Sequence, residues 1–226
     1  MSVSINKSVI QFLQKLEKNN TREWFAEHKP EFKDLELGVK QFFGALHIKL
    51  QLHDDIERLK VFRIYRDVRF SKDKTPYKTH FGASFHRKKP QLRGGYYVHI
   101  APNDSFIATG FWNPNKEDLF RIRKEFEIDS SEIRAILNDK AFATVWGGFV
   151  GNQVKTAPKG FSKEDPNIDL IKRKQFIFTK KFSNAEVLSP NFINQVDIDF
   201  QAIQPYFDYM TSLLTTDLNG ESLISH

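Results

Sequence analysis

The sequence contains no cysteine among its 226 residues, which excludes disulfide bonds, thiolate metal sites and a cysteine nucleophile. No apolar run approaches the length of a membrane-spanning helix, and the N-terminus lacks the basic-then-apolar pattern of a signal peptide. We therefore expect a cytoplasmic protein with no membrane partner. Linkers, repeats and low-complexity segments are also missing, so we expect one domain over residues 1–216 and a frayed tail at 217–226.

Common catalytic and metal-binding motifs are missing as well. There is no Gly-x-Ser-x-Gly, which argues against a serine nucleophile. His80, His86 and His99 do not occur as His-x-His or His-Glu-x-x-His, so the sequence favours neither a metal site nor a cofactor. A Mg²⁺ ion held by Asp67 and Asp73 is an alternative, although these carboxylates are better explained as salt-bridge partners of neighbouring Arg and Lys.

Positive charge is concentrated in one segment. Residues 62–93 carry ten Lys or Arg and two Asp, whereas the rest of the chain carries 24 basic and 26 acidic residues. The formal charge of +6 therefore comes from this segment alone. A local excess of cations attracts anions.

Hydrophobic periodicity predicts helices at both ends of the chain and strands between them. The first helix covers residues 7–18. Asn20, with Glu23 three residues later, is the expected N-cap of a second helix, which Pro30 ends, kinks or restarts before a helix that reaches residue 50. Alternating segments predict strands over residues 61–70, 79–85, 96–100, 105–111 and 175–180. We expect an α+β fold, with a mostly antiparallel sheet of about five or six strands packed against helices from both ends of the chain.

The densest group of chemically specific residues lies in the first two predicted strands and the loop between them. Phe62 and Ile64 would face the core, while cations, tyrosines and a histidine face outward. Arg22 of the second helix is added to this group. The candidate ligand-binding residues are then Arg22, Arg63, Arg66, Arg69, Lys72, Asp73, Lys74 and Lys78. The candidate acid–base groups are Tyr65, Asp67, Tyr77 and His80.

Five stretches of the chain resemble the DUF2461 family. They are Asn19–Phe25 with His28-Lys29, Phe62–Lys78, Gly95–Ile100, Gly110–Pro114 and Pro158–Leu170. The resemblance covers nearly the whole chain, and its central block is long and specific. It implies membership of a family and no particular reaction.

Three functions remain open. The basic residues could bind a small phosphate- or carboxylate-bearing ligand, in an enzyme or a binding protein. They could instead follow the phosphates of a nucleic acid while tyrosines stack on its bases. A third alternative is a domain that docks on an acidic protein, and a plain solvated basic surface explains the same residues. A pocket would favour the small anion and an open basic stripe the polymer. Nothing in the sequence indicates an oligomeric state.

Overall fold

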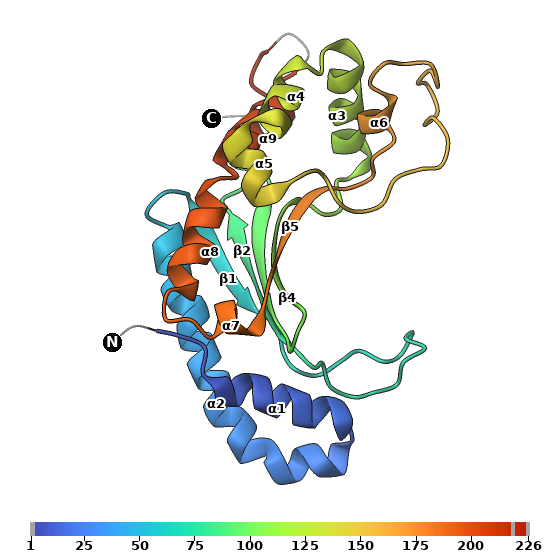
Figure 1. Cartoon of the computed structure of the whole chain (residues 1–226). Helices are drawn as coiled ribbons and strands as arrows, with labels where there is room; N and C mark the ends of the chain where they lie inside the picture. Colours follow the sequence, from blue (N-terminus) through green and yellow to red (C-terminus); the bar gives the residue numbers. More distant parts are fainter. Residues whose placement is uncertain (1–2, 218–219, 225–226) are drawn as a thin grey trace. The chain divides into compact units, whose positions relative to one another are not determined.

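The computed structural model describes residues 3–217 and 220–224, which form helices and one sheet (Figure 1). Two helices begin the chain, α1 (Lys7–Lys18) and α2 (Arg22–Leu50). Four strands follow: β1 (Ile56–Val61), β2 (Phe81–Arg87), β3 (Gly95–Ile100) and β4 (Ser105–Phe111). The remaining elements are α3 (Lys116–Ile128), α4 (Ser131–Asn138), α5 (Lys140–Trp146), α6 (Ile168–Ile171), β5 (Phe176–Phe182), α7 (Asn184–Val187), α8 (Phe192–Gln201) and α9 (Gln204–Thr215).

The five strands form a single open antiparallel sheet in the order β1-β2-β3-β4-β5. Each strand therefore pairs with its neighbours in the sequence, as in a meander. This confirms the predicted α+β class, with one antiparallel sheet and helices contributed by both ends of the chain.

The chain forms two compact units. Unit 1 comprises Met1–His86, Tyr97–Ile107 and Lys181–Ile198, and unit 2 comprises Arg87–Tyr96, Ala108–Lys180 and Asp199–His226. Strands β2, β3, β4 and β5 each have residues in both units. The predicted extent of one domain, residues 1–216, stays a prediction.

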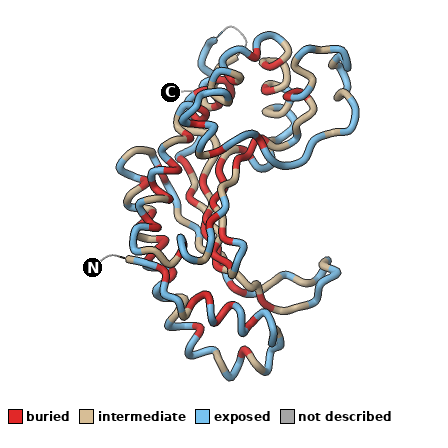
Figure 2. The backbone as a smooth tube through the Cα atoms, viewed as in Figure 1, coloured by how far each residue is buried: buried red, intermediate tan, exposed pale blue. Residues whose placement is uncertain are grey.

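The core of unit 1 lies between α2 and one face of the strands. Phe32 of α2 stacks on Phe81 of β2 with ring centroids 5.8 Å apart and nearly parallel planes. Farther along α2, Phe42 stacks on Phe192 of α8 at 5.6 Å. These rings are buried because α2 places apolar residues at three- and four-residue spacing, which forms one continuous stripe. Figure 2 shows buried residues along the strands and mainly exposed or half-buried ones along the loop between β1 and β2.

Unit 2 has its own aromatic core. Phe126 of α3 packs edge-on against Phe176 of β5. The fully buried hydroxyl of Tyr206 donates a hydrogen bond of 2.9 Å to the Phe176 carbonyl oxygen, which satisfies both polar groups inside an apolar cluster.

The predicted strand over residues 61–70 is wrong. Strand β1 ends at Val61, and residues 62–80 form the loop to β2, which we call the basic loop (Figure 1). Asp67 bonds the backbone N–H of Arg69 at 3.2 Å, and such local side-chain bonds compete with a strand ladder. Phe62, expected in the core, is only half-buried.

One expectation for the second helix is corrected, and of the alternatives given for Pro30 an end and a restart are excluded. The N-cap of the helix is Thr21, whose hydroxyl accepts the Trp24 N–H at 3.2 Å. The Asn20 side chain instead bonds the backbone of Tyr77. Pro30 lies inside α2, which continues through it as one helix of 29 residues. The proline ring removes one backbone donor, and Pro30 is exposed, so water can bond the carbonyl that loses its partner.

Parts of the expected C-terminal tail are described. Thr216 forms an antiparallel bridge with Ser222, and the Leu223 N–H bonds the Thr215 carbonyl at 2.8 Å. The fraying expected for residues 218–219 and 225–226 lies outside the described residues. Over the described part of the chain, no helix combines the length and hydrophobicity needed to cross a membrane.

Replacing Phe32 by alanine should lower the free energy of unfolding by about 3–5 kcal/mol, because it removes a buried ring that touches several others. Urea unfolding measures this loss. Leu37→Ala is the matched control, since Leu37 lies on the same helix but is 59% exposed, and should change stability by less than about 0.5 kcal/mol. Equal effects of the two substitutions would contradict the packing of α2 on the sheet.

Candidate functional site

The basic loop is a hairpin closed by backbone hydrogen bonds. The Arg66 N–H bonds the Pro76 carbonyl at 2.9 Å, and the Lys78 N–H bonds the Ile64 carbonyl at 2.8 Å. Tyr65 and Tyr77 form the antiparallel bridge between these contacts. The segment 67–75 is therefore the tip of the hairpin, and Lys78 to His80 lead directly into β2.

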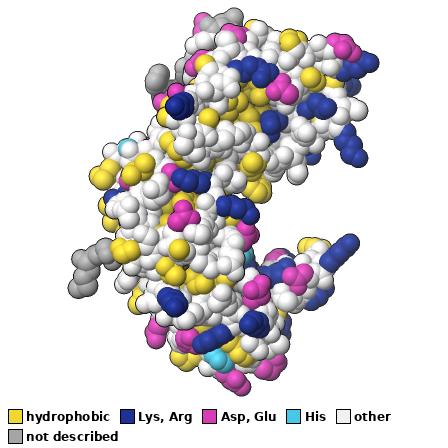
Figure 3. Space-filling view, in the orientation of Figure 1, with side chains coloured by type: hydrophobic (Ala, Val, Ile, Leu, Met, Phe, Trp, Pro, Cys, Tyr) yellow, Lys and Arg dark blue, Asp and Glu magenta, His cyan; other side chains and the backbone are white. Residues whose placement is uncertain are grey.

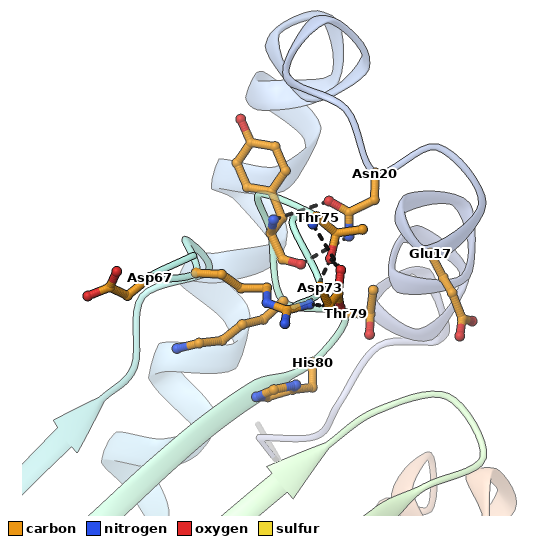
Figure 4. Close-up of a pocket in the computed structure, with 10 residues that line it drawn as sticks. Glu17, Asn20, Asp67, Asp73, Thr75, Thr79 and His80 are labelled. Carbon is orange, nitrogen blue, oxygen red and sulfur yellow. Dashed lines mark hydrogen bonds and ion pairs between the residues drawn. The ribbon is translucent and has the colours of Figure 1, made fainter. Parts of the chain in front are cut away.

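Asn20 attaches this hairpin to the turn between α1 and α2. Its side-chain amide donates to the Tyr77 carbonyl oxygen at 3.0 Å and accepts the Tyr77 N–H at 3.1 Å (Figure 4). The Tyr77 ring stacks on Phe25 of α2, with centroids 4.0 Å apart. One side chain and one ring pair thus fix the position of the backbone that carries Lys78 and His80.

Arg66 is held by the far side of the hairpin. Its guanidinium donates to the Asp73 carboxylate and, at 2.7 Å, to the Thr75 hydroxyl. Asp73 also accepts the backbone N–H and hydroxyl of Thr75 at 2.9 and 2.8 Å. The Thr75 backbone N–H, then the Arg66 guanidinium, lower the pKa of Asp73 to about 2. Asp73 therefore stays ionised and orients Arg66.

Asp67 belongs to a separate ion pair. Its carboxylate accepts from the Arg69 side chain at 3.0 and 2.6 Å, and that contact lowers the pKa of Asp67. Figure 4 shows Asp67 apart from the Asp73 and Thr75 cluster. The two aspartates considered for Mg²⁺ are thus each engaged by a different arginine. Among the residues that the structure describes, no group of three or more His, Asp or Glu side chains is arranged to hold a metal ion.

A pocket of about 550 Å³ lies beside these contacts, within unit 1. Its lining comes from α1, the α1–α2 turn and the basic loop, and consists of Glu17, Asn20, Arg66, Asp67, Asp73, Thr75, Tyr77, Lys78, Thr79 and His80. The pocket therefore collects six of the twelve predicted site residues: Arg66, Asp67, Asp73, Tyr77, Lys78 and His80.

Lys78 and His80 are half-buried in this lining, and each can carry a positive charge. Unlike Arg66, neither contacts a carboxylate among the described residues. The Lys78 ammonium donates to the Arg63 carbonyl at 2.9 Å, and burial, with the charges of Arg63 and Lys60, lowers its pKa. Burial, the His99 ring and the charges of Lys78 and Arg66 lower the pKa of His80 to about 4. His80 is therefore neutral at pH 7, while Lys78 lies in a positive environment.

The other predicted residues lie outside the pocket lining. Lys74 donates to the Val68 carbonyl at 2.9 Å, and Arg69 pairs with Asp67. Tyr65 is 46% exposed and packs on the Tyr77 ring. Arg22, Arg63 and Lys72 are exposed, Arg22 at the start of α2. In the space-filling view, a few acidic side chains lie among the basic ones of the basic loop (Figure 3), which has six Lys or Arg and two Asp.

Sequence reasoning missed Asn20 and Thr75 as site residues, and it missed the aromatic side chains next to His80. The His80 ring lies 4.0 Å from the His99 ring of β3 in a tilted arrangement, and His99 stacks on Phe106 of β4 at 4.6 Å. Strand alternation put His99 and Phe106 on definite faces, but the strand register that makes them neighbours is not visible in the sequence.

Comparison with protein families identifies the chain as a member of a family described as conserved hypothetical protein (DUF2461), whose model matches residues 8–209. The resemblance seen in the sequence is thus confirmed, and the chain belongs to this family. No curated protein and no solved structure gives a significant match.

Replacing Asn20 by alanine should destabilise the protein by about 1–3 kcal/mol, because two backbone groups of Tyr77 lose their partners. Hydrogen exchange of the Tyr77 amide should also become faster. Asn19→Ala is the control, since the Asn19 side chain bonds only the Lys15 carbonyl of α1. Unchanged protection of the Tyr77 amide in the Asn20 variant would refute the anchoring role.

The pKa of His80 predicts a pH-dependent stability. The native imidazole binds a proton only below about pH 4, whereas the unfolded chain binds it below about pH 6.5. The unfolded state therefore holds more protons between these values, so stability should fall from pH 6.5 to pH 4. His99, whose pKa is also lowered, acts in the same direction.

His80→Gln should reduce the loss of unfolding free energy between pH 6.5 and pH 4, as measured by urea unfolding between pH 4 and 7. Proton NMR should show the wild-type His80 imidazole titrating near pH 4. Titration near pH 6.5 would mean that the imidazole is solvated and not held neutral by its surroundings.

Proposed function

We propose that this protein binds a small anionic ligand, bearing a phosphate or carboxylate, in the pocket next to Lys78 and His80. The supporting observation is that the charges acting on these two half-buried groups are positive. Burial, with the charges of Arg63 and Lys60, lowers the pKa of Lys78, and burial, the His99 ring and the charges of Lys78 and Arg66 lower that of His80. An anion between them would relieve this repulsion, and each contact would be charge-assisted.

The carboxylates near the pocket do not oppose this proposal. Asp73 is paired with Arg66, and Asp67 with Arg69, so each pair is close to neutral. Glu17 is exposed on α1. Lys78, whose contacts are the Arg63 carbonyl and the Phe62 ring, then supplies the uncompensated positive charge. Thr79 adds a hydroxyl group to the same lining, whereas the Thr75 hydroxyl already donates to Asp73.

His80 is the best placed of the four acid–base candidates. Tyr77 is only 6% exposed, and Asp67 is bonded to Arg69. The neutral His80 imidazole can both donate to and accept from a bound ligand. We propose binding as the function, with His80 as the group that would exchange a proton with the ligand in any reaction. A cytoplasmic location, expected from the sequence, is part of the same proposal.

The pocket favours a small ligand over a polymer. A nucleic acid or an acidic protein would contact the exposed cations on the outer surface of the basic loop, such as Arg63 and Lys72, which lie outside the pocket lining. A small anion in the pocket would contact Lys78 and His80 and avoid that outer surface.

Isothermal titration calorimetry with inorganic phosphate and ribose 5-phosphate tests the proposal. Lys78→Gln should weaken binding about tenfold or more, because a charged hydrogen bond to the ligand is lost. Lys72→Gln removes the same charge from the same loop but outside the pocket, and should weaken binding less than about twofold.

Two results would reject the proposal. Equal losses in the two lysine variants, with binding that falls steeply as salt rises and is stronger for single-stranded oligonucleotides, would point to an open polymer-binding surface. No heat of binding with either phosphate compound would leave the basic loop as a solvated surface. Thermal unfolding of both variants controls for folding.

A further inference from the structure

One face of the strands in unit 1 carries a connected set of rings. The ring of His80, the residue directly before β2, lies 4.0 Å from the ring of His99 on β3, with the two planes tilted by 32°. His99 in turn stacks on Phe106 of β4 at 4.6 Å. Tyr97, two residues before His99, lies 5.9 Å from Phe106 and 6.0 Å from Phe62. We call these five residues the ring face: Phe62, His80, Tyr97, His99 and Phe106.

The ring face keeps contact with solvent. All five of its side chains are half-buried, whereas Phe81, Val98 and Ile107, their neighbours in the sequence, are buried. Those neighbours point to the opposite face, where Phe81 packs on α2. Strand alternation therefore separates a core face from a face that a ligand can reach.

Gly82 allows this arrangement. A Cβ atom at Gly82 would lie only 2.7 Å from the Tyr97 hydroxyl oxygen. Without it, the Tyr97 ring crosses β2 toward Phe62, and its hydroxyl lies 3.0 Å from His99 Nδ1. Burial raises the pKa of Tyr97, so its hydroxyl stays protonated and shares a hydrogen bond with His99 Nδ1. Nε2 is then the second polar atom of the His99 ring.

The ring face joins the anion pocket at two points. His80 lines the pocket, and its ring lies next to that of His99. Lys78 also lines the pocket, and its ammonium lies 5.5 Å from the centre of the Phe62 ring. The Lys60 ammonium lies 5.3 Å from the same ring. Cations are thus next to one end of a surface made of rings and neutral hydrogen-bonding groups.

We propose that the ring face binds the heterocyclic base of a nucleoside monophosphate whose phosphate occupies the neighbouring pocket. This rests on the proposed function and names its substrate class. A nucleobase has apolar faces, which suit Phe62 and Phe106, and polar edges, which suit the Tyr97 hydroxyl and the two imidazoles. The phosphate provides the charge that Lys60 and Lys78 attract.

Calorimetric titrations with uridine and adenosine 5′-monophosphates, ribose 5-phosphate, the free nucleosides and inorganic phosphate test this assignment. At least one nucleotide should bind about tenfold more tightly than ribose 5-phosphate, since contact of a base with an aromatic ring contributes about 1–3 kcal/mol. Phe106→Leu should abolish this difference and leave the affinity for ribose 5-phosphate within about twofold. Phe120→Leu, the same change at an exposed ring of α3, should alter neither affinity.

Gly82→Ala provides a second variant with no change of charge. The added methyl group must displace the Tyr97 hydroxyl, so nucleotide affinity should fall while ribose 5-phosphate affinity is kept. Thermal unfolding shows whether each variant is folded, and the wild-type comparison of ligands needs no variant.

The outcomes separate the two proposals. Equal affinity of the wild type for ribose 5-phosphate and both nucleotides would overturn the base subsite and leave the anion pocket standing. Binding of free nucleosides without any gain from phosphate would support the ring face and overturn the pocket. Absence of binding by every compound would overturn both.

Discussion

The two hydrogen bonds between the Asn20 amide and the Tyr77 backbone hold the basic loop in place. A loop of this length would otherwise be fixed by its own hairpin bonds, which restrain its two arms relative to each other but not relative to the helices. Asn20 supplies that second restraint from the α1–α2 turn, 57 residues away in the sequence. The wall of the pocket that contains Lys78 and His80 depends on it, because both residues directly follow Tyr77.

The six cations of the basic loop have different surroundings. Arg66 and Arg69 are paired with aspartates, and these pairs, together with the Thr75 contacts, shape the tip of the hairpin. Such exposed pairs contribute little to stability, but they fix where each guanidinium points. Lys78 has no such carboxylate contact and is half-buried next to His80. Net charge alone would not reveal this difference between orienting cations and one available for a ligand.

The regular elements could be predicted from the sequence where local pattern and tertiary pairing agree. The helix at 7–18 and the strand at 105–111 have their predicted bounds. The strand at 61–70 was wrong because its aromatic and β-branched residues favour a strand, yet Asp67 and Asp73 form local bonds that close a hairpin tip. The local pattern predicts Asn20 as a helix cap, because its actual partner, Tyr77, is distant in the sequence. The predicted basic residues were the right types, but only the hairpin register shows which of them share a pocket.

The ring face follows from a constraint on the opposite side of the same strands. Packing of Phe81 against Phe32 fixes the register and orientation of β2, and alternation then forces His80 and Gly82 onto the other side. His99 and Phe106 are fixed in the same way by buried Val98 and Ile107.

Side chains held by core packing lose little further freedom when a ligand binds, so the entropic cost of ordering them is already met in the free protein. Burying two neutral imidazoles and a tyrosine hydroxyl beside that core is unfavourable for stability alone. Their placement next to Lys78 agrees with the proposed ligand, which is charged at one end and cyclic at the other.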